Sequence, residues 1–143
     1  MEIFLGQQGE RDEILECFPH TKQALGNDGI LIVAKNDSKF LGFLWAFIRE
    51  IPLTDSQTEL FINVIEVFDA ENRCSGIGSL LVKKCIETAQ EKHCYQIRAY
   101  CDSGNIPSIK LWIKNGFTVS PVKMPNSSIP GAYVSFKISS SVL

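Results

Sequence analysis

Hydrophobic residues recur with the period of a β-strand in some segments of the chain and with the period of an α-helix in others. Apolar runs rich in β-branched and aromatic residues predict strands. Seven such runs occur, at 2–5, 30–35, 40–50, 60–68, 95–101, 117–123 and 132–138. The run at 60–68 is apolar at odd and even positions alike, which is typical of a central strand covered on both faces.

Several segments between these runs carry the apolar period of an amphipathic α-helix. Residues 77–92 give the clearest stripe, and residues 10–25 predict one or two helices that are interrupted near Pro19. A further helix is predicted at 105–114, because Asn105 can cap its first turn. The order of elements is therefore β-α-α-β-β-β-α-β-α-β-β, which favours the α/β (α+β) class.

The chain has 143 residues, of which 45% are hydrophobic and 21% are charged. This length and composition predict a single domain over residues 1–143 with one core. No apolar stretch approaches the ~20 residues of a membrane-spanning helix, so we expect no membrane partner. The first residues lack the basic segment and cleavage site of a secretory signal, and we therefore expect a cytoplasmic protein.

The net charge of -2 hides an asymmetry along the chain. Residues 1–72 contain 13 acidic and 5 basic residues, whereas residues 73–143 contain 3 acidic and 9 basic residues. A total this close to neutral argues against bulk nucleic-acid binding, so we expect no nucleic-acid partner. If the two halves form separate faces, the acidic half suits a cationic partner and the basic half an anionic one.

Five cysteines and two histidines are present, and their spacing does not match a metal site, so we expect no metal. An odd number of cysteines without CxxC spacing indicates free thiols in a reducing compartment. Cys85 lies on the apolar stripe of the 77–92 helix and is expected in the core. Cys74 precedes that helix and has two interpretations: a thiol whose pKa the helix terminus lowers, or an ordinary loop residue.

The strongest chemical signal is a glycine-containing loop between the run at 60–68 and the helix at 77–92. The segment consists of Arg73, Cys74, Ser75, Gly76, Ile77, Gly78 and Ser79. Backbone N–H groups at a helix start have no acceptor within the helix, and the helix dipole favours anions there. The segment is either a pyrophosphate cradle or a plain strand-to-helix turn. It is not a nucleotide P-loop, because the GxxxxGK[ST] pattern is absent.

This loop and a second segment together resemble the GNAT superfamily of acyl-CoA-dependent N-acetyltransferases. The loop reads R-x-x-G-x-G from Arg73 to Gly78. The second segment reads N-x-x-S-x-x-x-W-x-x-x-G-F from Asn105 to Phe117, which is similar in spacing to the family's N-x-x-A-x-x-x-Y-x-k-x-G-F pattern. The order of elements also matches this family over nearly the whole chain.

The resemblance implies a GNAT fold, with a mixed, mostly antiparallel sheet of six to seven strands and about four helices. In this family the fourth and fifth strands, here 60–68 and 95–101, splay apart around the pantetheine arm of acetyl-CoA. The resemblance assigns the thioester to the backbone of Val67 and Phe68, and the pyrophosphate to residues 73–79. It also implies that three residues flank the cofactor arm: Asn105, Ser108 and Trp112.

The family's usual reaction is direct attack of a neutral amine on the thioester, which needs a base for the ammonium and donors for the oxyanion. Glu66 is the candidate catalytic base, because it is an acidic residue inside an apolar strand, where burial would raise its pKa. A purely structural carboxylate is the alternative interpretation. Glu59 and Glu50 are weaker candidates for the same role.

The chain departs from the family where Trp112 replaces the tyrosine that commonly acts as the acid. An indole N–H donates a hydrogen bond but does not transfer a proton. Trp112 is therefore either a catalytic hydrogen-bond donor or a packing residue beside the cofactor arm. Tyr100, Tyr133 or water could replace the acid, and a thiolate with a pKa of ~8.5 does not require one.

Three functions remain open at this point. The chain is an N-acetyltransferase acting on a primary amine of a small molecule or peptide, a GNAT-fold domain that binds acyl-CoA with little or no turnover, or a phosphate-binding domain of another fold. The acidic first half suggests a cationic acceptor. Because many family members pair through C-terminal strands, the apolar run at 132–138 leaves a homodimer open.

Overall fold

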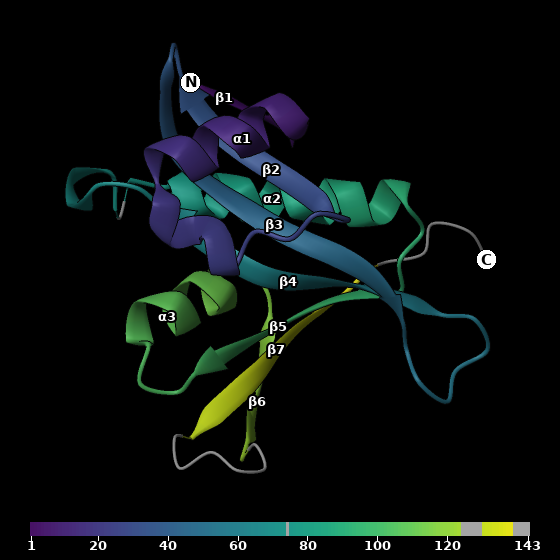
Figure 1. Cartoon of the computed structure of the whole chain (residues 1–143). Helices are drawn as coiled ribbons and strands as arrows, with labels where there is room; N and C mark the ends of the chain where they lie inside the picture. Colours follow the sequence, from purple (N-terminus) through teal and green to yellow (C-terminus); the bar gives the residue numbers. More distant parts are fainter. Residues whose placement is uncertain (74, 124–129, 139–143) are drawn as a thin grey trace. The chain divides into compact units, whose positions relative to one another are not determined.

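Figure 1 shows the computed structural model of the chain, which describes residues 1–73, 75–123 and 130–138. Its strands are β1 (Glu2–Gly6), β2 (Ile30–Asn36), β3 (Lys39–Glu50), β4 (Thr58–Val67), β5 (Gln96–Asp102), β6 (Thr118–Val122) and β7 (Gly131–Lys137). Its helices are α1 (Gln8–Cys17), α2 (Ile77–Glu91) and α3 (Ile106–Lys114), with two 3-10 turns, η1 (Pro19–Gln23) and η2 (Ala70–Asn72). The predicted order of elements is confirmed except for the second helix, which is replaced by η1.

The described residues contain three α-helices, where the sequence predicted about four. The segment after α1 forms the short 3-10 turn η1 instead of a full helix. Pro19 has no backbone N–H, and Phe18 adopts a φ of -133° and a ψ of 72°, so the helical hydrogen bonds end there.

The seven strands form one mixed sheet in the order β1-β2-β3-β4-β5-β7-β6. β4 runs parallel to β5, whereas the pairs β1–β2, β2–β3, β5–β7 and β6–β7 are antiparallel. The predicted fold class is therefore confirmed. β7 has a neighbour on each side, so the run at 132–138 offers no open edge to a second copy, and the outer strand beside it is β6.

The chain divides into two compact units, which we describe separately. Unit 1 contains residues 1–47 and 62–87, and unit 2 contains residues 48–61 and 88–143. β3, β4 and α2 each continue from one unit into the other. The single domain expected over residues 1–143 stays a prediction.

In unit 1, α1 and α2 lie on opposite faces of the sheet formed by β1, β2 and β3 (Figure 1). β2 is therefore covered on both sides, which explains its unbroken buried run: Leu31, Ile32, Val33 and Ala34. One core cluster of this unit consists of Ile14, Leu25, Leu31, Val33, Phe40, Phe43, Trp45 and Phe68. α2 contributes the predicted apolar stripe, in which Ile77, Leu81 and Cys85 are buried.

In unit 2, burial alternates along β5 and β7, as expected when a helix covers only one face of a sheet. The buried face carries Ile97, Ala99, Cys101, Ala132 and Val134. α3 lies over this face, because the ring of Trp112 contacts Phe117 and Phe117 in turn contacts Phe136. The other face carries side chains that are only partly buried: Arg98, Tyr100, Tyr133 and Ser135.

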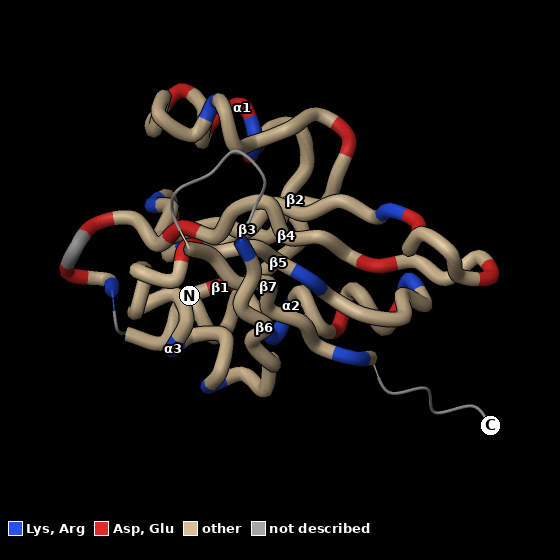
Figure 2. The backbone as a smooth tube through the Cα atoms, turned by 90° about the horizontal axis from the view of Figure 1, so that it is seen from below, with Lys and Arg blue, Asp and Glu red and all other residues tan. Residues whose placement is uncertain are grey.

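Acidic and basic residues are distributed over both units (Figure 2). The net charges of the two units differ less than the net charges of the two halves of the sequence. The reason is that α2, with Lys83 and Lys84 from the basic half, belongs mostly to the unit that holds most of the acidic half. Unit 1 has a net charge of -4 and unit 2 of +2. The acidic and basic halves of the sequence therefore do not correspond to the two units.

The described cysteines are free thiols: Cys17, Cys85, Cys94 and Cys101. Burial raises the pKa of the Cys94 and Cys101 thiols. Cys85 is fully buried, which confirms its predicted place in the core, and Cys74 lies outside the described residues. Within residues 1–73, 75–123 and 130–138, no helix is long and apolar enough to cross a membrane, and no three His, Cys, Asp or Glu side chains could hold a metal ion.

Candidate active site

The predicted site residues fall into two groups, one in each unit. Unit 1 holds the end of β4 and the glycine-containing loop, from Glu66 to Ser79, and unit 2 holds Asn105, Ser108 and Trp112.

At the end of β4, Phe68 is fixed by its ring and by its backbone. Its ring stacks on Phe18 with a centroid distance of 3.7 Å, and only 3% of the residue is exposed. Its N–H donates to the carbonyl oxygen of Leu41 in β3 at 2.8 Å. The N–H of Phe68 is therefore engaged with β3, and the expected place of the Phe68 backbone beside the thioester stays a prediction. Because successive N–H groups of a strand point to opposite sides, the N–H of Val67 points away from β3.

β3 and β4 approach each other very closely beside Val67. A Cβ atom added to Gly42 would lie 2.6 Å from the carbonyl oxygen of Glu66 and 3.2 Å from the Cα of Val67. A side chain at position 42 would therefore push the end of β4 outward. Gly42 is thus a structural requirement of the site, and the sequence pattern alone gave no signal for it.

Glu66 contacts His20, because its Oε1 lies 2.7 Å from His20 Nε2, which is within hydrogen-bond distance. The Glu66 side chain is 31% exposed and the His20 side chain is 60% exposed. The expected deep burial of Glu66 is therefore wrong: the turn η1 brings a polar partner to this part of β4. His20 has no signal in the sequence, since its distance from Glu66 depends on how η1 lies against β4.

Asn63 supports this arrangement from the same strand. Its Nδ2 donates to the carbonyl oxygen of Ala24 at 2.9 Å, directly after η1. This contact gives Asn63 a structural role. Together with the stacking of Phe18 on Phe68, it holds η1 against β4 within unit 1.

The glycine-containing loop has the geometry of an anion-binding helix start. Gly76 has a φ of +91°, and no heavy atom lies within 4 Å of a Cβ added to it. α2 begins at Ile77, and its first hydrogen bond runs from the Leu80 N–H to the Gly76 carbonyl at 3.1 Å. The first turn of α2 contains no acidic residue, so no carboxylate within the helix opposes its N-terminal dipole.

Two hydrogen bonds attach this loop to the end of β4. The Ser75 hydroxyl donates to the carbonyl oxygen of Asn72, and Asn72 Nδ2 donates to the carbonyl oxygen of Phe68 at 3.1 Å. Arg73 is exposed, and Gly78 and Ser79 are half-buried. The loop is thus held to the strand by its own polar residues, which leaves its outer side to solvent.

In unit 2, the predicted residues of α3 are engaged with one another. Asn105 Oδ1 accepts from the Ser108 N–H at 3.3 Å, which confirms Asn105 as the helix cap. The Trp112 indole N–H donates to Ser108 Oγ at 3.1 Å, and only 2% of Trp112 is exposed. Trp112 is therefore buried and bonded within α3, and its expected place beside the cofactor arm stays a prediction.

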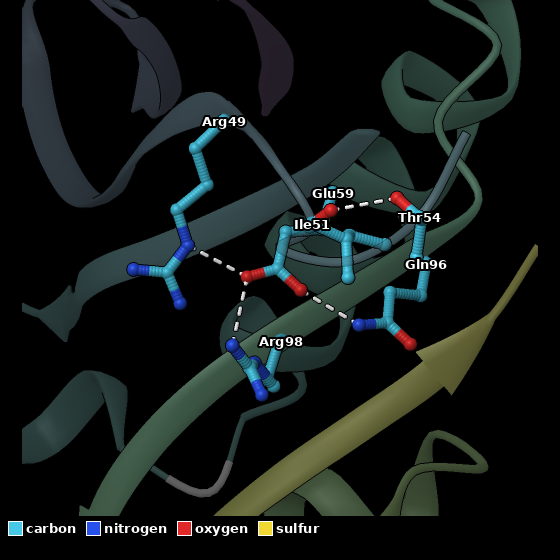
Figure 3. A network of polar contacts seen from close by, with 6 residues as sticks. All are labelled: Arg49, Ile51, Thr54, Glu59, Gln96 and Arg98. Carbon is cyan, nitrogen blue, oxygen red and sulfur yellow. Dashed lines mark hydrogen bonds and ion pairs between the residues drawn. The ribbon is translucent and has the colours of Figure 1, made fainter. Parts of the chain in front are cut away.

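β4 contains a second acidic residue, Glu59, which is buried more deeply than Glu66. Glu59 is 0% exposed, and the strand prediction missed it because β4 begins at Thr58 rather than at residue 60. Figure 3 shows its carboxylate between three donors: Arg49 Nε at 2.6 Å, Gln96 Nε2 at 2.6 Å and Arg98 Nη2 at 3.0 Å.

The donors around Glu59 determine its protonation. Burial raises the pKa of Glu59, but the hydrogen bonds from Gln96 and Arg49 and the charges of Arg98 and Arg49 outweigh burial and lower the pKa overall. Glu59 is therefore held as a carboxylate. A carboxylate whose acceptor sites are filled and whose pKa is lowered is a poor general base.

The two alternative acids lie in unit 2, side by side on β5 and β7. Tyr100 and Tyr133 are register partners, and their rings meet edge to face with centroids 5.6 Å apart. The Tyr100 hydroxyl lies against the backbone of Gly131, where a Cβ atom would collide with it. This explains a glycine at position 131.

Comparison with known proteins decides which family has this arrangement. The model of the acetyltransferase (GNAT) family matches residues 2–117, which include β4, the loop and α3. The chain belongs to the GNAT acetyltransferase family. The resemblance seen in the sequence is thereby confirmed, and a phosphate-binding domain of another fold is excluded. No curated protein matches the chain.

Solved structures of this family share the fold at low sequence identity. The chain is similar to yncA from Salmonella typhimurium with its cofactor acetyl-CoA, at 17% identity and a TM-score of 0.71, covering 99% of this chain and 96% of that one. It is similar to NAA60 from Arabidopsis thaliana in complex with acetyl-CoA, at 17% identity and a TM-score of 0.71, with 96% and 98% covered. It is also similar to the ribosomal-protein-alanine N-acetyltransferase from Brucella melitensis, at 17% identity and a TM-score of 0.70, with 96% and 99% covered.

Proposed function

We propose that this GNAT protein is an N-acetyltransferase that moves an acetyl group from acetyl-CoA to a primary amine. The observation that carries the proposal is the start of α2, where Gly76 leaves the backbone open and the first turn has no acidic residue. Such a helix start suits the pyrophosphate of coenzyme A. Two structural relatives are complexes with acetyl-CoA, which supports the same donor.

The residues of unit 1 supply two of the groups that the reaction needs. The Val67 N–H, which points away from β3, is the proposed donor to the oxyanion, and Glu66 is the proposed base. The neutral amine attacks the thioester carbonyl, a C–N bond forms, the C–S bond breaks and coenzyme A leaves as thiolate. The amine proton passes to Glu66, whose half-exposed carboxylate is accessible from solvent.

The leaving thiolate has no dedicated acid in this proposal. The Trp112 N–H is donated to Ser108, so it does not serve the thiolate. A thiol with a pKa of ~8.5 leaves as thiolate near neutral pH without protonation. Asn105 and Ser108 keep their proposed place beside the cofactor arm as part of the capped start of α3.

A second candidate function is acyl-CoA binding with little or no turnover, as a sensor or regulatory module. The observation that favours it is Trp112 at the position of the family's usual tyrosine. We propose a cytoplasmic location and a small-molecule or peptide acceptor for either candidate, and cell fractionation tests the location.

Calorimetric titration with acetyl-CoA tests the donor in both candidates. We expect one molecule of acetyl-CoA to bind per chain, and absence of binding would remove both functions. A thiol-release assay with a panel of primary amines then separates them, because only the enzyme releases coenzyme A in an amine-dependent manner.

A further inference from the structure

The partly exposed face of unit 2 carries two arginines that share one buried carboxylate. Arg49 Nε and Arg98 Nη2 both donate to Oε2 of Glu59, at 2.6 Å and 3.0 Å (Figure 3). Gln96 donates to the other oxygen at 2.6 Å. One carboxylate balances only one of the two guanidinium groups, so the cluster keeps a charge of about +1.

Both guanidinium groups are held in place before any ligand arrives. Arg49 lies over the ring of Phe61 with 4.1 Å to the centroid, and Arg98 lies over Tyr133 with 4.9 Å. Stacking on an aromatic ring and a hydrogen bond to a buried carboxylate restrict the long arginine side chains, which lowers the entropic cost of using them to bind a ligand.

Both guanidinium groups remain accessible, and they have more N–H donors than Glu59 can accept. The Arg49 side chain is 37% exposed and the Arg98 side chain is 29% exposed. A guanidinium has five N–H bonds, and the hydrogen bonds that these two form with described residues all go to Glu59. The Nε of Arg98 is buried without a partner in the described structure. The cluster therefore has more donors than its own residues can satisfy.

Lys137 adds a further positive charge on the same face. It is the register partner of Gln96, and its Nζ lies over the Tyr95 ring at 5.7 Å from the centroid. The surroundings thus suit a small anion with planar acceptor geometry, since the guanidinium fork matches a carboxylate.

We propose that the face around Arg49 and Arg98 binds a small carboxylate. The net charge of unit 2, which is +2, also favours an anion on this face.

A titration of the whole protein with succinate tests this site, and NMR of the arginine Nε–H signals detects the binding. We expect saturable shifts of Arg49 and Arg98, and a loss of affinity of ~10-fold in Arg49→Lys and Arg98→Lys, which keep the charge but lose the fork. Lys92→Gln removes an exposed charge elsewhere in unit 2 and should bind as the parent does. Absence of saturation, or equal weakening by Lys92→Gln, would overturn the site.

Discussion

Glu59 and Glu66 are two carboxylates of β4, and their different surroundings suit them to different roles. Glu59 is buried and receives three hydrogen bonds, whereas Glu66 is half-exposed and contacts His20. The carboxylate of Glu59 is enclosed inside unit 2, whereas that of Glu66 is accessible to a ligand or to water.

Glu66→Gln should reduce kcat ~100-fold or more at neutral pH, since general base catalysis typically contributes that much. The loss should shrink at high pH, where the acceptor amine is already neutral, and calorimetric affinity for acetyl-CoA should not change. Steady-state rates measured from pH 6 to 10 check this, with exposed Glu91→Gln as the matched control. A parallel pH profile for parent and variant would remove Glu66 from the role of base.

Glu59 should make the free energy of unfolding depend on pH in the acidic range. Its pKa is lowered in the folded state from an ordinary value of 4.5, so its contribution is complete above that value and is lost as pH falls through the folded pKa. Glu59→Gln should cost about 2–4 kcal/mol of unfolding free energy at pH 7, because it leaves two arginines without their counter-charge.

Urea unfolding of the parent and of Glu59→Gln at pH 7, 5, 4 and 3 measures this linkage. The difference between the two proteins should narrow below pH 4.5, as the parent loses its ionised carboxylate. A constant difference across this range would mean that Glu59 acts by packing alone.

At the scale of elements, the end of β4, the loop and the start of α2 act as one piece. Ser75 and Asn72 tie the loop to the strand, and Gly76 takes the positive φ that turns the chain into the helix. Only glycine adopts this conformation at little cost. The site therefore depends on backbone geometry more than on side-chain chemistry.

Gly76→Ala should weaken acetyl-CoA binding ~10-fold or more, because a β-carbon disfavours φ near +91° and the loop would have to reshape. Gly9→Ala is the matched control, since no heavy atom lies within 4 Å of its added Cβ and it lies in α1. Calorimetry compares the two variants with the parent. Equal affinities for all three would contradict a pyrophosphate site at this loop.

Strands, helices and the capped start of α3 could be predicted because they depend on local period and capping chemistry. Asn105 gave a correct helix start, and the apolar run of β4 gave a correct central strand. Contacts between distant segments could not be predicted: no local pattern pairs His20 with Glu66 or places Arg49 beside Arg98. The partner of each acid is set by tertiary packing.

At the scale of the whole molecule, the sequence predicted the sheet and the family, but its acidic and basic halves do not correspond to the two units. β4 and α2 cross from one unit to the other, so a division of the sequence into halves does not follow the fold. Unit 2, although it contains part of the acidic half, has a positive net charge.

The most direct test of the central claim is amine-dependent release of coenzyme A from acetyl-CoA by the intact protein, followed with a thiol reagent and confirmed by the mass of the product. We predict turnover with at least one primary amine, an added acetyl group on that amine, and loss of the reaction in Glu66→Gln. Tight acetyl-CoA binding with no thiol release across zwitterionic, cationic and peptide amines would contradict the claim.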